Sequence, residues 1–279
     1  MTLRKHWTVA LAALVALGLS GCLKVKSQNK LETSGKGTYS LKATVDLSVI
    51  KRMEAMLGEF GDLTEGPDAP EADEGANEVK ADFEKDLLKL KHAEGVRVVK
   101  HSVEEQDDGN KLVCVMELEY DSLKQLFLAG VLGDIAVKLE AAGENTWTLT
   151  QNLKMDGMPE GDLDAGAGQG EQPPMMNLLS AFMKDLEIAL AFTAPGEVTK
   201  TNGKKSADGR SVTFGGGLKW MTDPKNRTMS VTFKAPGAAL KPFALTAAEI
   251  AVNEKKLEEK VEAELKAEKE PAGAGAAGG

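Results

Sequence analysis

Residue types and motifs that carry out chemistry are scarce in this chain. It has two cysteines and three histidines among 279 residues, and no Cys-x-x-Cys or His-x-x-x-His spacing groups them as metal ligands. The Gly-x-Ser-x-Gly signature of serine hydrolases and the Gly-Lys-Ser/Thr of phosphate-binding loops are missing as well. The 43 acidic residues are so many that chance pairs of carboxylates carry no information. We therefore expect no enzymatic activity, no catalytic residue, no metal site and no cofactor.

Positive charge is in deficit too. The chain has 34 Lys and Arg residues against 43 Asp and Glu residues, a net charge of −9 at pH 7. Proteins that bind nucleic acids need basic patches to neutralise phosphates, so a nucleic-acid partner is not expected. The same deficit disfavours broad electrostatic adhesion to anionic lipid headgroups. Any attachment to a membrane should therefore depend on hydrocarbon rather than on surface charge.

Only one hydrophobic run stands out, and it lies close to the N-terminus. Residues 7–19 are mostly apolar, but the run is shorter than the roughly 20 residues that a membrane-spanning helix needs. Arg4 and Lys5 precede it, which is the order found in secretory signal peptides. The run ends in Leu19-Ser20-Gly21-Cys22, and this quartet resembles the lipobox of bacterial lipoproteins.

The lipobox resemblance implies that residues 1–21 form a lipoprotein signal peptide, cleaved between Gly21 and Cys22. Cys22 would then carry acyl chains, palmitate among them, and these would hold the protein at a membrane of the cell envelope. Leu23 is not the acidic residue that retains some lipoproteins at the inner membrane, so the outer membrane is favoured if the host has two. The alternative is an ordinary signal peptide followed by an unmodified cysteine.

Acylation of Cys22 would leave Cys114 as the only other cysteine, so no intramolecular disulfide is expected. Cys114 lies in an apolar strand beside Met116, which predicts a buried and unreactive thiol. His92 falls at the end of an expected helix and His101 within an expected strand. We interpret His92 as favourably placed near a helix C-terminus and His101 as solvent-facing, rather than as ligands.

Alternating apolar and polar residues indicate strands that pair as hairpins, and Asp107–Asn110 is a turn sequence suited to positive φ. Pairs of strands followed by a helix, without regular βαβ alternation, favour an α+β fold. We predict an antiparallel β-sheet built from hairpins with a few packing helices, plus a C-terminal charged helix. The expected strands lie within residues 23–47, 96–106, 111–121, 135–139, 147–149, 187–193, 196–201, 210–214 and 228–234, and the expected helices cover about 48–60, 79–94, 122–129, 175–185 and 246–269.

Beyond the signal peptide the chain divides into two parts. Residues 22–235 form the α+β domain, in which residues 61–77 and 155–174 have compositions that predict mobile loops. Residues 236–279 look separate from that domain. They contain a capping-box signature, Thr246 to Glu249, which opens a helix rich in Glu and Lys, followed by a Gly/Ala-rich tail that is expected to be disordered.

One segment of the domain suggests contact with an apolar ligand. It is the expected helix at residues 175–185, whose apolar face is rich in methionine, a residue that suits adaptable contacts. A groove beneath this helix would accept a lipid. The alternative, which we favour, is that the helix packs on the sheet, because such a stripe at helical spacing is usually core. The residues of this face are Met175, Met176, Leu179, Phe182 and Met183.

Three pieces of the sequence point to a family. They are Cys22-Leu23-Lys24-Val25, then Gly95-Val96-Arg97-Val98, and finally Pro195-Gly196-Glu197-Val198-Thr199-Lys200-Thr201-Asn202-Gly203 with Asp208-Gly209-Arg210-Ser211-Val212-Thr213-Phe214. Together they resemble the LppM-type lipoprotein domains of bacteria over about residues 22–235. The resemblance implies a mixed α/β envelope domain that binds a lipid or a glycolipid. Many family members end in a transmembrane helix, whereas the tail of this chain is charged and Gly/Ala-rich, which leaves the N-terminal lipid as the expected anchor.

Two functions are therefore expected to compete. The first is a membrane-anchored, non-catalytic lipoprotein whose envelope domain binds a lipid or glycolipid. The second is a structural or assembly lipoprotein that contacts a protein partner through its C-terminal helix. A binding module should enclose an apolar cavity of about 300–1,000 Å³ with a few polar groups, whereas a spacer should have a filled core.

Overall fold

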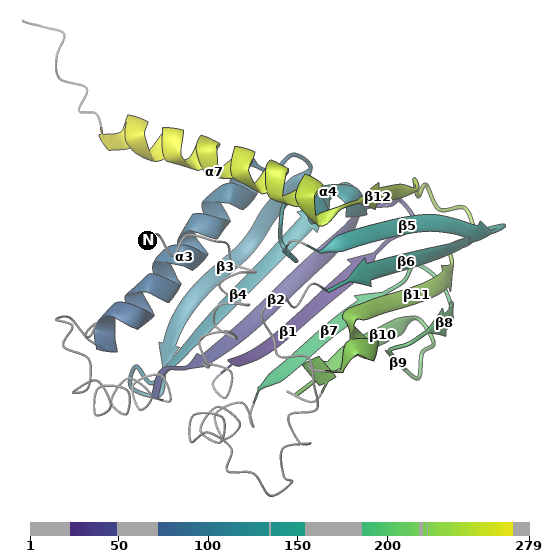
Figure 1. The fold of residues 1–279 in the computed structure, drawn as a ribbon, viewed down its shortest axis with the longest axis horizontal. Helices are drawn as coiled ribbons and strands as arrows, with labels where there is room; N and C mark the ends of the chain where they lie inside the picture. Colours follow the sequence, from purple (N-terminus) through teal and green to yellow (C-terminus); the bar gives the residue numbers. More distant parts are fainter. Residues whose placement is uncertain are drawn as a thin grey trace, which may run out of the picture.

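The computed structural model describes residues 23–48, 72–133, 135–153, 186–217, 220–221 and 223–269. They form an α+β fold of two β-sheets and packed helices, as the sequence predicts (Figure 1). The predicted cleavage site, Gly21 and Cys22, lies outside the described residues, as does the segment with Met175, Met176, Leu179, Phe182 and Met183. Among the described helices, none is long and apolar enough to cross a membrane.

The larger sheet has seven strands, and we call it the large sheet. Its neighbouring strands are antiparallel except for β1 and β7, which pair in parallel with Lys24 opposite Glu187. The long hairpin of β3 and β4 turns at Asp107–Asn110, where Asp107 and Asp108 have positive φ, as predicted. The strand order is β3 (Val96–Gln106), β4 (Lys111–Tyr120), β2 (Gly37–Asp46), β1 (Leu23–Leu31), β7 (Glu187–Thr193), β10 (Ser211–Gly216) and β9 (Lys204–Lys205).

The second sheet, which we call the small sheet, has five strands that are all antiparallel. Its strand β11 (Thr228–Lys234) is the predicted alternating one, and its residues Met229, Val231 and Phe233 are buried. The chain passes from this sheet to the large one at residues 202–203, between β8 and β9. The strand order is β12 (Phe243–Leu245), β5 (Ala136–Gly143), β6 (Thr146–Asn152), β11 (Thr228–Lys234) and β8 (Val198–Thr201).

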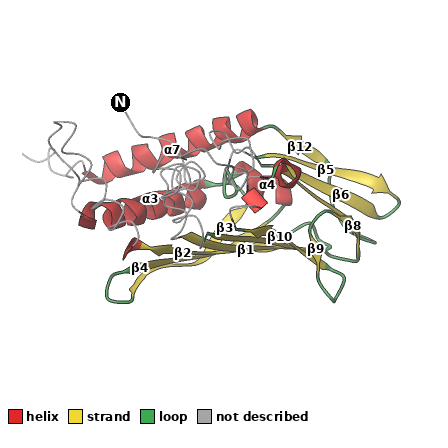
Figure 2. Cartoon of the chain, turned by 60° about the horizontal axis from the view of Figure 1, so that its bottom comes forward, coloured by secondary structure: helices red, strands yellow, loops and turns green. Residues whose placement is uncertain are grey.

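Helices and the small sheet together cover one face of the large sheet. Figure 2 shows α3 and α7 above one end of that sheet and the small sheet above the other end, with α4 between them. The two sheets meet through the tilted rings of Phe192 and Phe233, whose centroids are 5.7 Å apart. The helices are α3 (Ala72–His92), α4 (Leu123–Leu128), the 3-10 helix η3 (Pro224–Arg227) and α7 (Ala247–Lys269).

The start of α3 differs from the sequence prediction. The helix begins at Ala72 rather than near Val79, so residues 72–77 of the expected loop 61–77 are helical. Acidic residues in this stretch suit the first turns of a helix, because negative charge is favourable near the positive end of the helix dipole. Residues 49–71, with the rest of that loop and most of the helix expected before it, lie outside the described residues, and so does the expected loop 155–174.

The C-terminal helix begins with the predicted capping box. The backbone N–H of Thr246 donates to the Glu249 carboxylate at 2.8 Å, and the N–H of Glu249 donates to the Thr246 hydroxyl at 3.2 Å. The apolar stripe of α7, at Ile250, Leu257 and Val261, is buried, and the helix packs against α3 and α4. This part of the chain therefore shares the core of the domain.

Candidate ligand crevice between the two sheets

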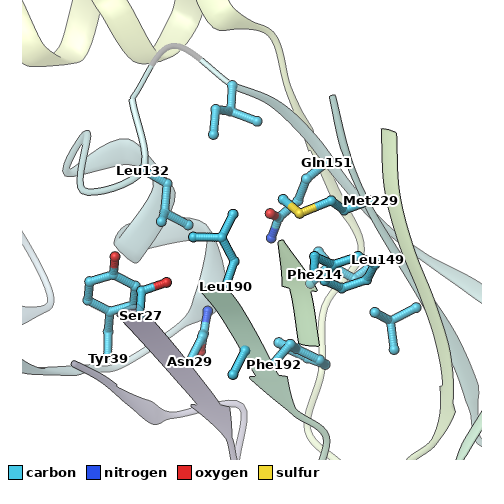
Figure 3. A pocket seen from close by; sticks show the side chains of 13 residues that line it. Ser27, Asn29, Tyr39, Leu132, Leu149, Gln151, Leu190, Phe192, Phe214 and Met229 are labelled. Atoms are coloured by element: carbon cyan, nitrogen blue, oxygen red, sulfur yellow. The ribbon is translucent and has the colours of Figure 1, made fainter. Parts of the chain in front are cut away.

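A crevice lies between the two sheets, beside the loop that joins α4 to β5 (Figure 3). The large sheet contributes residues of β1, β2, β7 and β10, and the small sheet contributes residues of β6 and β11. Most of the wall is apolar, and the polar groups gather on β1, with one tyrosine from β2 and one glutamine from β6. The lining residues are Ser27, Asn29, Tyr39, Leu132, Ile135, Leu149, Gln151, Leu190, Ala191, Phe192, Phe214, Met229 and Val231.

The polar side of the crevice comes from the alternation of β1. Every second residue of this strand points into the domain, beginning with Leu23, and the inward positions are all buried. Two of them are polar, because Ser27 and Asn29 occupy positions where a core strand normally carries hydrocarbon. The sequence analysis did not single out these two residues, although the alternation that locates them is visible in the printed sequence.

Asn29 is held in place by a tyrosine from another strand. The hydroxyl of Tyr120 donates to the side-chain oxygen of Asn29 at 2.7 Å, and it also lies 3.2 Å from the carbonyl oxygen of Lys30. Only 5% of Asn29 is exposed. Its amide nitrogen has no hydrogen-bond partner among the described residues, and Figure 3 shows that nitrogen directed into the crevice.

The path of Tyr120 across the sheet depends on Gly37, its partner on β2. A Cβ atom on Gly37 would lie 2.3 Å from the Tyr120 hydroxyl and 2.2 Å from the carbonyl oxygen of Lys30. Residue 37 must therefore lack a side chain if the tyrosine ring is to reach Asn29.

The described residues that line the crevice carry no net charge at neutral pH. Burial raises the pKa of Tyr39 far above its ordinary value, and a hydrogen bond with Ser27 only partly offsets this. Burial, and then the nearby charge of Glu32, raise the pKa of Tyr120 in the same direction. Both phenols are thus neutral, and none of the thirteen lining residues is charged. The site offers hydrogen bonds and apolar contact, without an ionic partner.

The crevice is narrow. The space between its walls is about 490 Å³ when it is counted out to the open mouth, but the centre of a water molecule can occupy only about 40 Å³ of it. The second value is far below the roughly 300–1,000 Å³ of ordinary ligand pockets, so the site is a slot between nearly touching walls. Side chains such as Leu132 and Leu190, which lie in the middle of Figure 3, would have to shift to admit more than a few small atoms.

The residues that the sequence analysis considered for chemistry lie away from this crevice. Cys114 is buried in β4, where burial raises the pKa of its thiol to about 11, as expected for an inert core cysteine. His92 ends α3, where its ring nitrogen lies 2.5 Å from the Glu264 carboxylate of α7, and His101 is exposed on β3. Within the described parts of the chain, no three His, Cys, Asp or Glu side chains form a group that could hold a metal ion.

No protein-family model matches the chain, and no curated protein matches it either. Among solved structures, it is similar to the folded domain of LppM from Mycobacterium tuberculosis, determined by NMR. The two chains are 15% identical and superpose with a TM-score of 0.37, over 76% of this chain and 90% of that chain. A similarity at this level supports no conclusion about activity, so the functional proposals below depend on the residues themselves.

Proposed function

We propose that this protein is a membrane-anchored lipoprotein of the bacterial cell envelope whose non-catalytic domain binds a lipid-like ligand in the crevice between its sheets. The observation that supports the ligand site is the combination of apolar walls with a few inward polar groups on β1. Sites for apolar ligands commonly have this composition, in which the walls supply affinity and the polar groups fix the orientation. The sequence that supports the anchor is the lipobox-like quartet ending at Cys22.

The narrowness of the slot limits the ligand to one slender hydrocarbon chain. Burial of each methylene group contributes about 0.8 kcal/mol, so about ten of them contribute about 8 kcal/mol. Association costs at least about 4 kcal/mol in lost freedom of motion, and shifting the walls adds to that cost. From the hydrocarbon alone we therefore expect a dissociation constant of about 1 mM or weaker. A bulky multi-chain glycolipid would enter with one chain, its remaining groups staying outside.

The ligand site is tested by filling the crevice with a larger side chain. Leu190 lines the crevice and is half-buried, so a Leu190→Trp variant should exclude the chain. Val252→Trp is the matched control, because Val252 is 57% exposed on α7. Protein extracted from envelopes is analysed by native mass spectrometry for a co-purifying lipid. We expect the lipid with the parent protein and with the control, and none with Leu190→Trp. An absence of lipid in all three proteins would refute the binding proposal.

The anchor is tested separately by Cys22→Ser. We expect this variant to lose incorporation of labelled palmitate and to leave the membrane fraction, because the proposed attachment depends on acyl chains at one thiol. Palmitate labelling and membrane fractionation that persist in the variant would contradict the proposed lipoprotein anchor, while leaving the crevice open to its own test.

The second function, assembly through the C-terminal helix, has one observation in its favour. Val252 and Leu265 of α7 are 57% and 38% exposed, so two apolar side chains of this helix are accessible to an envelope protein. The other apolar residues of the stripe are buried within the domain, which leaves only a small apolar area for a partner. For this reason we rank the ligand-binding function first.

A further inference from the structure

The side-chain amide of Asn29 is a strongly directional group in the wall of the crevice. The residue sits on β1 between β2 and β7, opposite Tyr39 on one side and Phe192 on the other. A strand paired on both sides fixes the backbone at this position. The side chain is fixed as well, since its oxygen accepts a 2.7 Å hydrogen bond from Tyr120.

This arrangement leaves a donor without an acceptor. The oxygen of Asn29 is occupied, and its nitrogen faces the crevice with no partner in the described structure. A buried N–H group that loses water without gaining another acceptor is unfavourable. A ligand atom that accepts this hydrogen bond therefore gains more affinity than an equal amount of hydrocarbon.

The charge of that ligand atom is restricted by the walls. None of the described residues that line the crevice is charged, and both neighbouring phenols are neutral at physiological pH. An ionised carboxylate or phosphate placed beside Asn29 would lose its hydration and meet no cation in return, which is costly. An ester carbonyl or a hydroxyl oxygen needs only hydrogen bonds, and those are present at this end of the crevice.

We infer that the crevice selects a neutral single-chain ester or alcohol, whose oxygen accepts a hydrogen bond from the Asn29 amide, over an ionised fatty acid with the same chain. The inference rests on the proposed ligand site and adds the chemical class of its ligand. Ser27 and Tyr39 line the same end of the crevice, and their hydroxyl groups supply further contacts for the polar end of such a molecule.

The test compares probes that share one acyl chain. The full chain carrying Cys22→Ser is titrated at pH 8 with monolauroyl glycerol, a neutral ester, and with laurate, an ionised acid, both below their critical micelle concentrations. We expect the ester to bind roughly ten- to hundredfold more tightly, the range that one satisfied buried donor provides. Asn29→Leu, which removes the donor at similar volume, should reduce ester binding by the same factor. Gln28→Leu changes the neighbouring exposed residue of β1 and should leave ester binding unchanged.

A second measurement leaves Asn29 unchanged. In the NMR spectrum of the Cys22→Ser chain, the side-chain amide resonances of Asn29 should shift on titration with the ester and remain in place with laurate.

The outcomes separate this inference from the proposal beneath it. The ligand class is wrong if laurate binds as tightly as the ester, or if Asn29→Leu keeps full ester affinity. In either case the ligand site itself is still supported if Leu190→Trp abolishes the binding of both probes. If neither probe binds the Cys22→Ser chain with Asn29 and Leu190 intact, both the ligand site and its ligand class are refuted.

Discussion

Gly37→Ala should destabilise this fold more than any exposed substitution on the same strand, although it adds a single methyl group. The new Cβ would lie 2.2 Å from the carbonyl oxygen of Lys30 and 2.3 Å from the hydroxyl of Tyr120. The first atom belongs to the backbone of β1 and the second to a ring that is 2% exposed, so neither can move away freely. The backbone of Gly37 does not need a positive φ, so the effect is purely one of space.

The magnitude follows from two costs. Forcing an extra carbon into packed surroundings typically costs about 1–3 kcal/mol. Displacing Tyr120 also breaks its hydrogen bond to the buried Asn29, and leaving such groups unpaired costs about 1–3 kcal/mol. We therefore expect a loss of about 2–5 kcal/mol in the free energy of unfolding, a large part of the about 5–15 kcal/mol of a typical domain.

Urea denaturation, followed by circular dichroism, measures this loss. Thr38→Ala is the matched control, because Thr38 is the next residue of β2 and is exposed on the opposite face, and its cost should stay within about 0.5 kcal/mol. Tyr120→Phe, which removes only the hydroxyl, should fall between the two variants. If Gly37→Ala unfolds at the same urea concentration as Thr38→Ala, the steric reasoning, and with it the role of Tyr120 in fixing Asn29, would be refuted.

Three further predictions concern other parts of the domain. Burial raises the pKa of Cys114 to about 11, so in a Cys22→Ser chain its thiol should resist Ellman's reagent at pH 8 until urea unfolds the protein. The contribution of this neutral thiol to the stability of the fold should be lost as the pH rises from about 9 through 11. Burial also raises the pKa of Asp86 to about 6, outweighing the favourable charge of Lys89. The free energy of unfolding should therefore increase as the pH falls from about 6 to 4, because the folded protein takes up the proton more readily than the unfolded chain. Asp86→Asn should remove this pH dependence in urea denaturation. Leu257→Ala should cost about 2–5 kcal/mol because Leu257 is buried in the docked face of α7, whereas Val252→Ala on its exposed face should cost under about 0.5 kcal/mol by the same measurement.

Local features of the fold were predictable from the sequence because local residues determine them. The turn at Asp107–Asn110 follows from residues that tolerate positive φ, and the capping box at Thr246 follows from a spacing of three residues. The burial of Cys114 follows from its place among apolar neighbours. Each of these predictions needed no knowledge of which segments meet in space, and each is confirmed.

The candidate site depends on contacts that no local pattern specifies. The parallel pairing of β1 with β7 joins strands more than 150 residues apart, and the crevice exists only because the small sheet packs over that pair. Periodicity shows that Ser27 and Asn29 face inward. It does not show that Tyr120 reaches Asn29 from another hairpin, which leaves one amide nitrogen for a ligand.

Strand β1 begins at Leu23, the residue directly after Cys22. One residue of extended chain spans only about 3.5 Å, so an acylated Cys22 would give the domain no tether on which to swing away from the bilayer. Anchored in this way, the protein would stay at the depth of the headgroups and could exchange ligands with the leaflet beneath it without crossing open water. Its reach toward more distant parts of the envelope would then be set by the rigid dimensions of the two sheets.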